Sequence, residues 1–94
     1  MTVTFFDYPG CPHCALAKRI LRELQEEEPA CRAISFAYVD ETARPDYADG
    51  FDYWYTPSLF LGDRKLYEAS PFRAPKKVRA MLKDVLDGLI ASEA

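Results

Sequence analysis

The 94-residue chain has one histidine and three cysteines, and this scarcity limits the metal chemistry available to it. Cys11 and Cys14 form one Cys-x-x-Cys pair, and no second such pair exists to complete a zinc site. A closed site within one chain would need Cys31 and His13 as well, so we expect redox chemistry instead. A metal or iron–sulfur cluster shared between two chains through Cys11 and Cys14 is the alternative. We interpret the odd Cys31 as a small apolar filler, with a regulatory or glutathionylated thiol as the alternative.

The chain also lacks an excess of positive charge and any long hydrophobic run. Its formal net charge of −3 argues against a general nucleic-acid binder. No apolar run approaches the roughly 20 residues that span a membrane, and the first expected strand leaves no room for a signal peptide. We therefore expect a cytoplasmic monomer that binds neither nucleic acid nor membrane. No repeat, low-complexity segment or linker interrupts residues 1–94, which predicts a single domain.

The first half of the sequence predicts a strand, a helix and a second strand. Residues 2–6 are all β-branched or aromatic, which predicts a buried strand. The following helix, over residues 15–24, has one apolar face consisting of Ala17, Ile20, Leu21 and Leu24, and a solvent side consisting of Lys18, Arg19, Arg22 and Glu23. Residues 33–39 alternate and predict a second strand, with Ile34, Phe36 and Tyr38 on one face. Because a helix intervenes, the two strands should be parallel.

The second half predicts a short helix, a hairpin and a long helix. Residues 44–53 predict a short, irregular helix that Gly50 weakens. Residues 58–61 and 65–68 predict a β-hairpin around a glycine-containing turn. The last helix opens near Pro75 and has apolar residues at helical spacing as far as Ile90. The complete expected order is β-α-β-α-β-β-α.

The Cys-x-x-Cys pair lies where the first strand gives way to the first helix. Gly10 lets the chain turn, and Pro12 suits the first helical position, where no amide hydrogen is needed. Cys11 then occupies the helix N-cap, facing unpaired amide groups that stabilise a thiolate. Side chains three apart on a helix have Cβ atoms about 5–6 Å apart, close to the geometry of a disulfide. The pair is therefore suited to cycling between dithiol and disulfide.

We predict that Cys11 is the attacking sulfur, with a pKa below about 7.5. Cys14, one turn into the helix, should be more shielded, have a higher pKa and act as the resolving thiol. Protonated His13, between the two cysteines, would lower the Cys11 pKa further. The rate of alkylation against pH, measured on Cys14→Ser, tests this expectation. An inflection near the pKa of free cysteine would exclude activation of Cys11.

A Cys-x-x-Cys at a strand-to-helix turn, followed by Thr56-Pro57 before a β-hairpin, resembles the thioredoxin superfamily. The small size is most similar to glutaredoxins and their redoxin relatives. The resemblance covers the whole chain and implies an α/β fold, with a four-stranded mixed sheet flanked by helices. It implies a thiol–disulfide oxidoreductase that uses Cys11 as nucleophile, Cys14 as resolving cysteine and Pro57 as a cis-proline. The Thr56 backbone would pair with the substrate like a neighbouring strand.

The resemblance also implies the partners: a disulfide-containing protein substrate, and a reductase or low-molecular-weight thiol. No cofactor is implied beyond the Cys11–Cys14 disulfide. Glutaredoxins usually have a lysine where this chain has Tyr8, and a Gly-Gly turn where it has residues 68–73. These two departures weigh against glutathione as the donor, and glutathione and a thioredoxin-type reductase are the two alternatives. Pro12-His13 is the dipeptide of the periplasmic disulfide oxidases, in which the histidine favours the thiolate and gives a more oxidising couple.

An aromatic cluster immediately precedes Thr56 in the sequence. It consists of Phe51, Tyr53, Trp54 and Tyr55, and Tyr8 adds a fifth ring near the motif. Two interpretations are open for this cluster. The rings either belong to the core or form an apolar rim around the sulfurs that suits docking of a protein partner.

Overall fold

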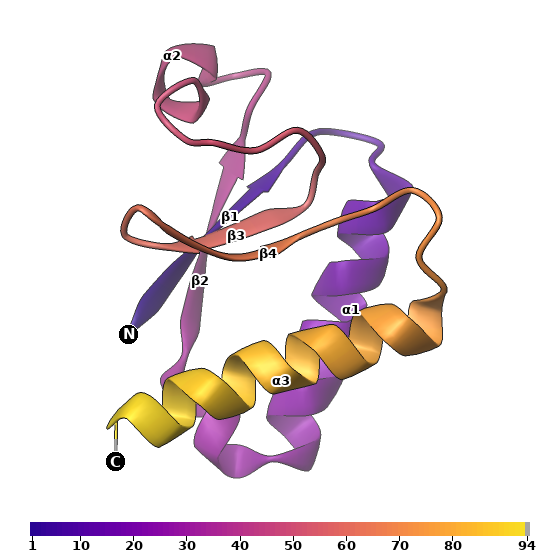
Figure 1. The fold of residues 1–94 in the computed structure, drawn as a ribbon, viewed down its shortest axis with the longest axis vertical. Coiled ribbons are helices and arrows are strands. Elements are labelled where there is room, and N and C mark those ends of the chain that lie inside the picture. The colour runs from indigo at the N-terminus through magenta and orange to yellow at the C-terminus, as the bar shows by residue number, and fades with distance from the viewer. Residues whose placement is uncertain (94) are drawn as a thin grey trace.

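The chain forms a mixed sheet of four strands with helices packed against both of its faces (Figure 1). The computed structural model of the protein describes residues 1–93. In chain order the elements are β1 (Thr2–Asp7), α1 (Pro12–Glu27), the 3-10 helix η1 (Pro29–Ala33), β2 (Ser35–Asp40), α2 (Pro45–Ala48), β3 (Ser58–Leu61), β4 (Arg64–Glu68) and α3 (Pro75–Glu93). The predicted β-α-β-α-β-β-α order is confirmed, and η1 is added to it.

β1 is an inner strand, which explains its uninterrupted run of bulky residues. The strand order is β2-β1-β3-β4, with β1 parallel to β2 and antiparallel to β3. Val3 and Phe5 are buried with residues of α1 and α3, whereas Phe6 belongs to a separate cluster with residues of β2, α2 and β3. Successive side chains of a strand point to opposite faces, so a strand covered on both faces is apolar on both. The predicted parallel pairing of the first two strands is confirmed.

Helices α1 and α3 pack against each other and against one face of the sheet. The face predicted for the first helix is buried, and it consists of Ala17, Ile20, Leu21 and Leu24. In α3 the buried residues recur at helical spacing, namely Val78, Leu82, Leu86 and Leu89. Pro75 is the first residue of α3, as the sequence predicts. This two-helix layer and the sheet enclose the larger hydrophobic core.

On the opposite face, the prediction of a helix over residues 44–53 is wrong in extent. α2 is a single turn that ends at Ala48. Gly50 follows it, and glycine is a poor helix former. The rings of Phe51 and Tyr53 pack against Phe6, with centroid separations of 4.8 and 5.0 Å. Packing of these two rings against the sheet fixes the segment in an irregular path that a longer helix could not follow.

The second strand is also shorter and less buried than predicted. Residues 29–33 form η1, so β2 begins at Ser35. Ile34 is buried, but Phe36 is half-buried and Tyr38 is exposed. β2 is an edge strand, where the neighbouring helices cover less of the surface. The alternation of apolar residues correctly predicted which side chains of the strand share one face. It did not reveal that the strand lies at the edge of the sheet.

The turn between β1 and α1 lies at the upper right of the view in Figure 1. β1 begins at the left and α3 ends at the lower left, so both lie away from this turn (Figure 1). Within residues 1–93, no helix combines the length and apolar character that a membrane crossing requires.

Candidate functional site

Cys11 caps the first turn of α1 through its own sulfur. Its backbone is extended, with φ −73° and ψ 110°, and the Cys14 N–H donates to Cys11 Sγ over 3.1 Å. Gly10 has a φ of 81°, a conformation that favours glycine, and it turns the chain out of β1 into the cap. A sulfur that accepts a helix-start amide is stabilised as a thiolate. The local sequence Gly-Cys-Pro therefore builds the cap that the sequence predicts.

Cys11 and Cys14 form a disulfide in the structure. Their Cα atoms are 5.2 Å apart, within the roughly 4.4–6.8 Å that bridged cysteines show. Both residues are buried, with 5% and 2% of their surfaces exposed, respectively. The dithiol and disulfide forms are therefore both compatible with the backbone of the turn.

The structure brings Thr56 and Pro57 against the disulfide from a distant part of the chain. The Thr56–Pro57 peptide bond is cis, as the resemblance implies. The Cys11 sulfur lies 3.7 Å from Thr56 Oγ1 and 3.9 Å from the Thr56 carbonyl oxygen. The hydroxyl hydrogen of Thr56 can point at a Cys11 thiolate and stabilise it. Pro57 is fully buried and supplies no amide hydrogen to this contact.

A cavity of about 490 Å³ opens beside the two cysteines. It is lined by the turn from Tyr8 to Pro12, by Cys14, and by the charged residues Asp7, Lys18 and Asp40. Tyr8 is exposed at this cavity, where a substrate can contact it. Pro12 and His13 are exposed at the start of α1, and the His13 side chain has no hydrogen-bond or ion-pair partner within residues 1–93.

Sequence reasoning missed the ion pair between Asp7 and Lys18, which lies in this cavity. It assigned Lys18 to the solvent side of the helix. Lys18 comes four residues after Cys14 and therefore lies on the same helical face. Its Nζ atom also lies 4.9 Å from the centre of the Tyr38 ring on β2. This spacing, together with an aspartate that ends the strand before the motif, was a usable signal in the sequence.

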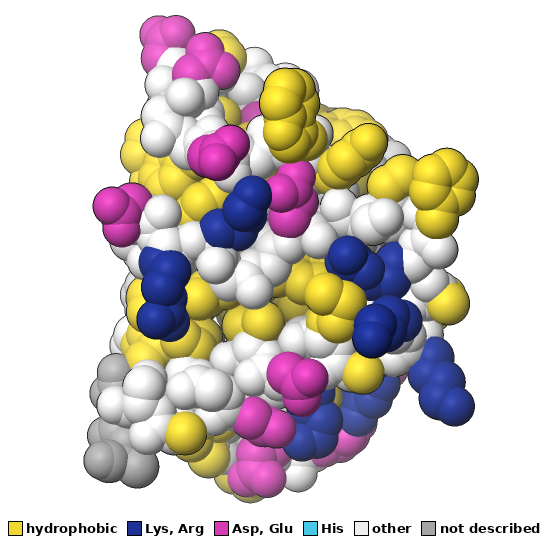
Figure 2. All heavy atoms as spheres, in the orientation of Figure 1, with side chains coloured by type: hydrophobic (Ala, Val, Ile, Leu, Met, Phe, Trp, Pro, Cys, Tyr) yellow, Lys and Arg dark blue, Asp and Glu magenta, His cyan; other side chains and the backbone are white. Residues whose placement is uncertain are grey.

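The aromatic cluster before Thr56 divides between core and surface. Phe51 and Tyr53 pack on Phe6, whereas Trp54 is 88% exposed and Tyr55 is also exposed. Phe72, in the loop before α3, is a further aromatic residue with a high exposure of 96%. Figure 2 shows hydrophobic side chains standing out from the upper right part of the molecule. The core interpretation is therefore confirmed for Phe51 and Tyr53, and the docking rim stays a prediction for the exposed Trp54 and Tyr55.

Cys31 is buried in η1, away from the other two cysteines. Burial, followed by the nearby Asp87 and Glu28 carboxylates, raises the pKa of this thiol above its usual value. A thiol with a raised pKa is a poor nucleophile at neutral pH. Its position therefore agrees with the role of a small apolar filler.

Tyr53 anchors the segment that leads to Thr56. Its hydroxyl donates to Glu41 Oε1 over 2.7 Å. Burial, followed by this hydrogen bond, raises the Tyr53 pKa above its usual value of 10.0. The folded protein thus keeps the Tyr53 proton at a pH where the unfolded chain releases it.

We expect the wild type to lose stability above about pH 10 relative to Tyr53→Phe, by up to about 1.4 kcal/mol per pH unit. A group whose pKa is raised by folding contributes its full share to the free energy of unfolding at a pH below its pKa in the unfolded chain. This contribution falls as the pH rises toward the pKa in the folded protein. Urea unfolding of both proteins at about pH 8 and about pH 10.5 measures the difference. Equal losses in the two proteins would contradict this account, since the other tyrosines are common to both.

Comparison with known proteins identifies the fold. No family model matches the chain, and no curated protein matches it in sequence. Among solved structures, a malarial protein is similar with a TM-score of 0.58 and 21% identity, over 90% of this chain and 96% of that one. Thioredoxin 1 from the thermophilic eubacterium Thermosipho africanus is similar with a TM-score of 0.56 and 13% identity, over 95% and 98% of the two chains.

The zinc-bound form of human ERp44 is similar with a TM-score of 0.58 and 20% identity. The match covers 95% of this chain but 26% of ERp44, so the chain spans about a quarter of that protein. The chain therefore has the fold of the thioredoxin superfamily, as the resemblance implied. Within that fold, the Cys11–Cys14 pair at the strand-to-helix turn is consistent with redox function.

Proposed function

We propose that the protein is a dithiol thiol–disulfide oxidoreductase of the glutaredoxin and thioredoxin type. One observation carries the proposal: the Cys11 sulfur caps α1, is bonded to Cys14, and lies against Thr56 beside a cis-proline. The cap favours the thiolate that attacks a disulfide. The partner sulfur is already in place to complete the exchange.

In the proposed reaction, the reduced protein transfers two electrons to a substrate disulfide. The Cys11 thiolate attacks one substrate sulfur, forms a mixed disulfide and releases the other substrate sulfur as a thiolate. The Cys14 thiolate then attacks Cys11 Sγ, which forms the Cys11–Cys14 disulfide and releases the second substrate thiolate. A reductase or a low-molecular-weight thiol returns two electrons to the protein and restores the dithiol.

The remaining site residues bind the substrate or tune the sulfurs in this proposal. The Thr56 backbone pairs with an extended substrate segment, and Pro57 keeps amide hydrogens away from the sulfurs. Tyr8 contacts the substrate at the cavity. Pro12 fixes the start of α1, and protonated His13 adds positive charge near the helix start. The exposed rings of Trp54 and Tyr55 provide apolar contact to a protein substrate.

We further propose a cytoplasmic protein that acts as a monomer on protein disulfides. A reactive Cys-x-x-Cys fits a reducing compartment better than a structural bridge does. The residues that would bind glutathione in glutaredoxins are replaced at Tyr8 and over 68–73. A thioredoxin-type reductase is therefore the donor to test first, with glutathione and its reductase in parallel.

The test measures turnover and metal content on the same preparation. The purified protein is mixed with a protein disulfide, NADPH and either reductase system, and NADPH oxidation is recorded. Substrate-dependent oxidation with one system supports the proposal. Zinc is one metal to quantify, because a zinc-bound form of ERp44 is among the similar structures, and iron is the other, because an iron–sulfur cluster is the alternative. Stoichiometric metal or cluster absorbance after anaerobic purification, without any thiol–disulfide exchange, would overturn the proposal in favour of a binding module shared between two chains.

A further inference from the structure

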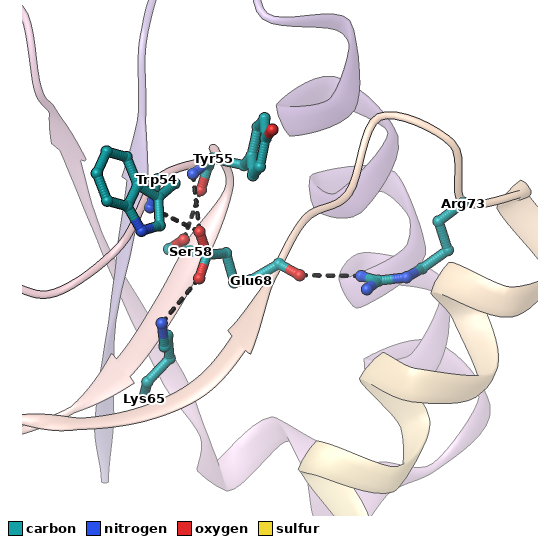
Figure 3. Close-up of polar contacts among 6 residues, drawn as sticks. All are labelled: Trp54, Tyr55, Ser58, Lys65, Glu68 and Arg73. Carbon is teal, nitrogen blue, oxygen red and sulfur yellow. Dashed lines mark hydrogen bonds and ion pairs between the residues drawn. The ribbon is translucent and has the colours of Figure 1, made fainter.

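Glu68, the last residue of β4, binds the segment that carries Thr56 (Figure 3). Its Oε2 atom accepts hydrogen bonds from the Trp54 N–H over 2.6 Å and from the Tyr55 N–H over 2.9 Å. Its Oε1 atom accepts from Lys65 Nζ over 2.8 Å. The main-chain carbonyl of Glu68 accepts from Arg73 Nη1 over 2.9 Å, which fixes the end of the strand as well.

Two carbonyl groups on either side of Thr56 are also paired. Ser58 Oγ donates to the Tyr55 carbonyl over 2.6 Å, and the Ala69 N–H donates to the Pro57 carbonyl over 3.0 Å. Thr56 differs from these residues. Within residues 1–93 its N–H donates to no protein group, and its carbonyl contacts only the Cys11 sulfur. Thr56 therefore keeps both its N–H and its C=O free of backbone partners within residues 1–93, and its carbonyl lies beside the reactive sulfur.

The charge of Glu68 strengthens this arrangement. Burial by itself would raise the pKa of the carboxyl, but the hydrogen bonds from Lys65 and from the Trp54 and Tyr55 amides outweigh it, and the pKa is lowered. The group is therefore ionised at neutral pH. Hydrogen bonds from amides to a carboxylate are shorter and stronger than bonds between neutral groups.

We propose that Glu68 is a positioning residue that holds Trp54 and Tyr55 so that Thr56 presents its backbone to a substrate strand at Cys11. The inference rests on the proposed function, and it adds a residue whose hydrogen bonds within residues 1–93 go to Trp54, Tyr55, Lys65 and Arg73 and not to the sulfurs. A protein disulfide, which arrives within an extended chain, depends on the Thr56 backbone for docking. A small disulfide reaches Cys11 without that pairing. The loss of Glu68 should therefore act on protein substrates through KM.

The experiment compares Glu68→Ala, Glu68→Gln and the control Lys65→Met. Insulin serves as the protein disulfide and hydroxyethyl disulfide as the small one, with the same reductase for both. For Glu68→Ala we expect kcat/KM on insulin to fall by between about 10-fold and 100-fold, mostly through KM. On the small disulfide we expect a change of less than about twofold. Glu68→Gln keeps one acceptor oxygen of the same reach and should restore most of the loss. Lys65→Met keeps the amide contacts and should match the wild type.

Amide NMR provides a readout that does not depend on activity. The Trp54 and Tyr55 amide protons should shift upfield in both Glu68 variants, because the carboxylate acceptor is replaced or removed. If Glu68→Ala does not fold, the amide shifts in Glu68→Gln still test the contact of the Glu68 side chain with the Trp54 and Tyr55 amides. Unchanged shifts in Glu68→Gln, or equal losses on insulin and on the small disulfide, would overturn the positioning role. A wild type that reduces neither disulfide would overturn the proposed function, and the role of Glu68 with it.

Discussion

Replacement of Cys11 by serine is expected to abolish thiol–disulfide exchange, with a loss of at least about 100-fold in rate. A serine hydroxyl at the helix cap stays protonated at neutral pH and cannot attack a disulfide at a comparable rate. Cys14→Ser should behave differently, because Cys11 still attacks but no second sulfur resolves the product. We therefore expect a covalent mixed disulfide to accumulate between Cys14→Ser and its protein substrate.

The matched control is Cys31→Ser, which changes the third cysteine without touching the disulfide. Its exchange rate should stay close to that of the wild type. Mass spectrometry before and after addition of dithiothreitol shows whether a trapped complex is held by a reducible bond. A trapped complex with Cys11→Ser, and none with Cys14→Ser, would reverse the roles assigned to the two sulfurs.

Phe6→Ala is expected to lower the free energy of unfolding by about 3–5 kcal/mol. The ring is fully buried, and it contacts the rings of Phe51, Tyr53 and Phe60 with centroid separations of 4.8, 5.0 and 5.8 Å. Its removal leaves a cavity under the segment that leads to Thr56. Since a domain of this size is stable by about 5–15 kcal/mol, the loss is a large fraction of the total.

Phe72→Ala provides the control, because that ring is 96% exposed and its removal should change stability by less than about 0.5 kcal/mol. Urea denaturation followed by circular dichroism measures both variants. A loss below about 1 kcal/mol for Phe6→Ala would show that the aromatic cluster collapses into the space at little cost. The packing of the irregular segment would then not depend on β1.

The sequence was most informative where structure is set by neighbouring residues. Gly10, Cys11 and Pro12 determine the turn and the helix cap among themselves, and both were predictable. The apolar face of α1 followed from periodicity, and the burial of β1 followed from its unbroken run of β-branched and aromatic residues. The contact of Thr56 with Cys11 was predictable only through the resemblance, since 45 residues separate the two.

Other features depend on contacts between elements, and local patterns do not encode them. The predicted extent of α2 was wrong because the rings of Phe51 and Tyr53 pack against the sheet, and the chain that carries them leaves the helical path. The exposure of Tyr38 follows from the strand order, which periodicity does not reveal. Glu68 was expected only as the end of a strand. Its role emerges when β4 is placed beside the irregular segment before Thr56.

The distance of the start of β1 and the end of α3 from the β1–α1 turn has a practical consequence. Because β1 begins and α3 ends away from this turn, an affinity tag or a fused reporter domain attached beyond either element leaves the sulfurs accessible (Figure 1). The protein can therefore be immobilised on a resin through a terminal tag. Such a column, carrying Cys14→Ser, would retain substrates from a cell extract as covalent adducts and release them with a reductant.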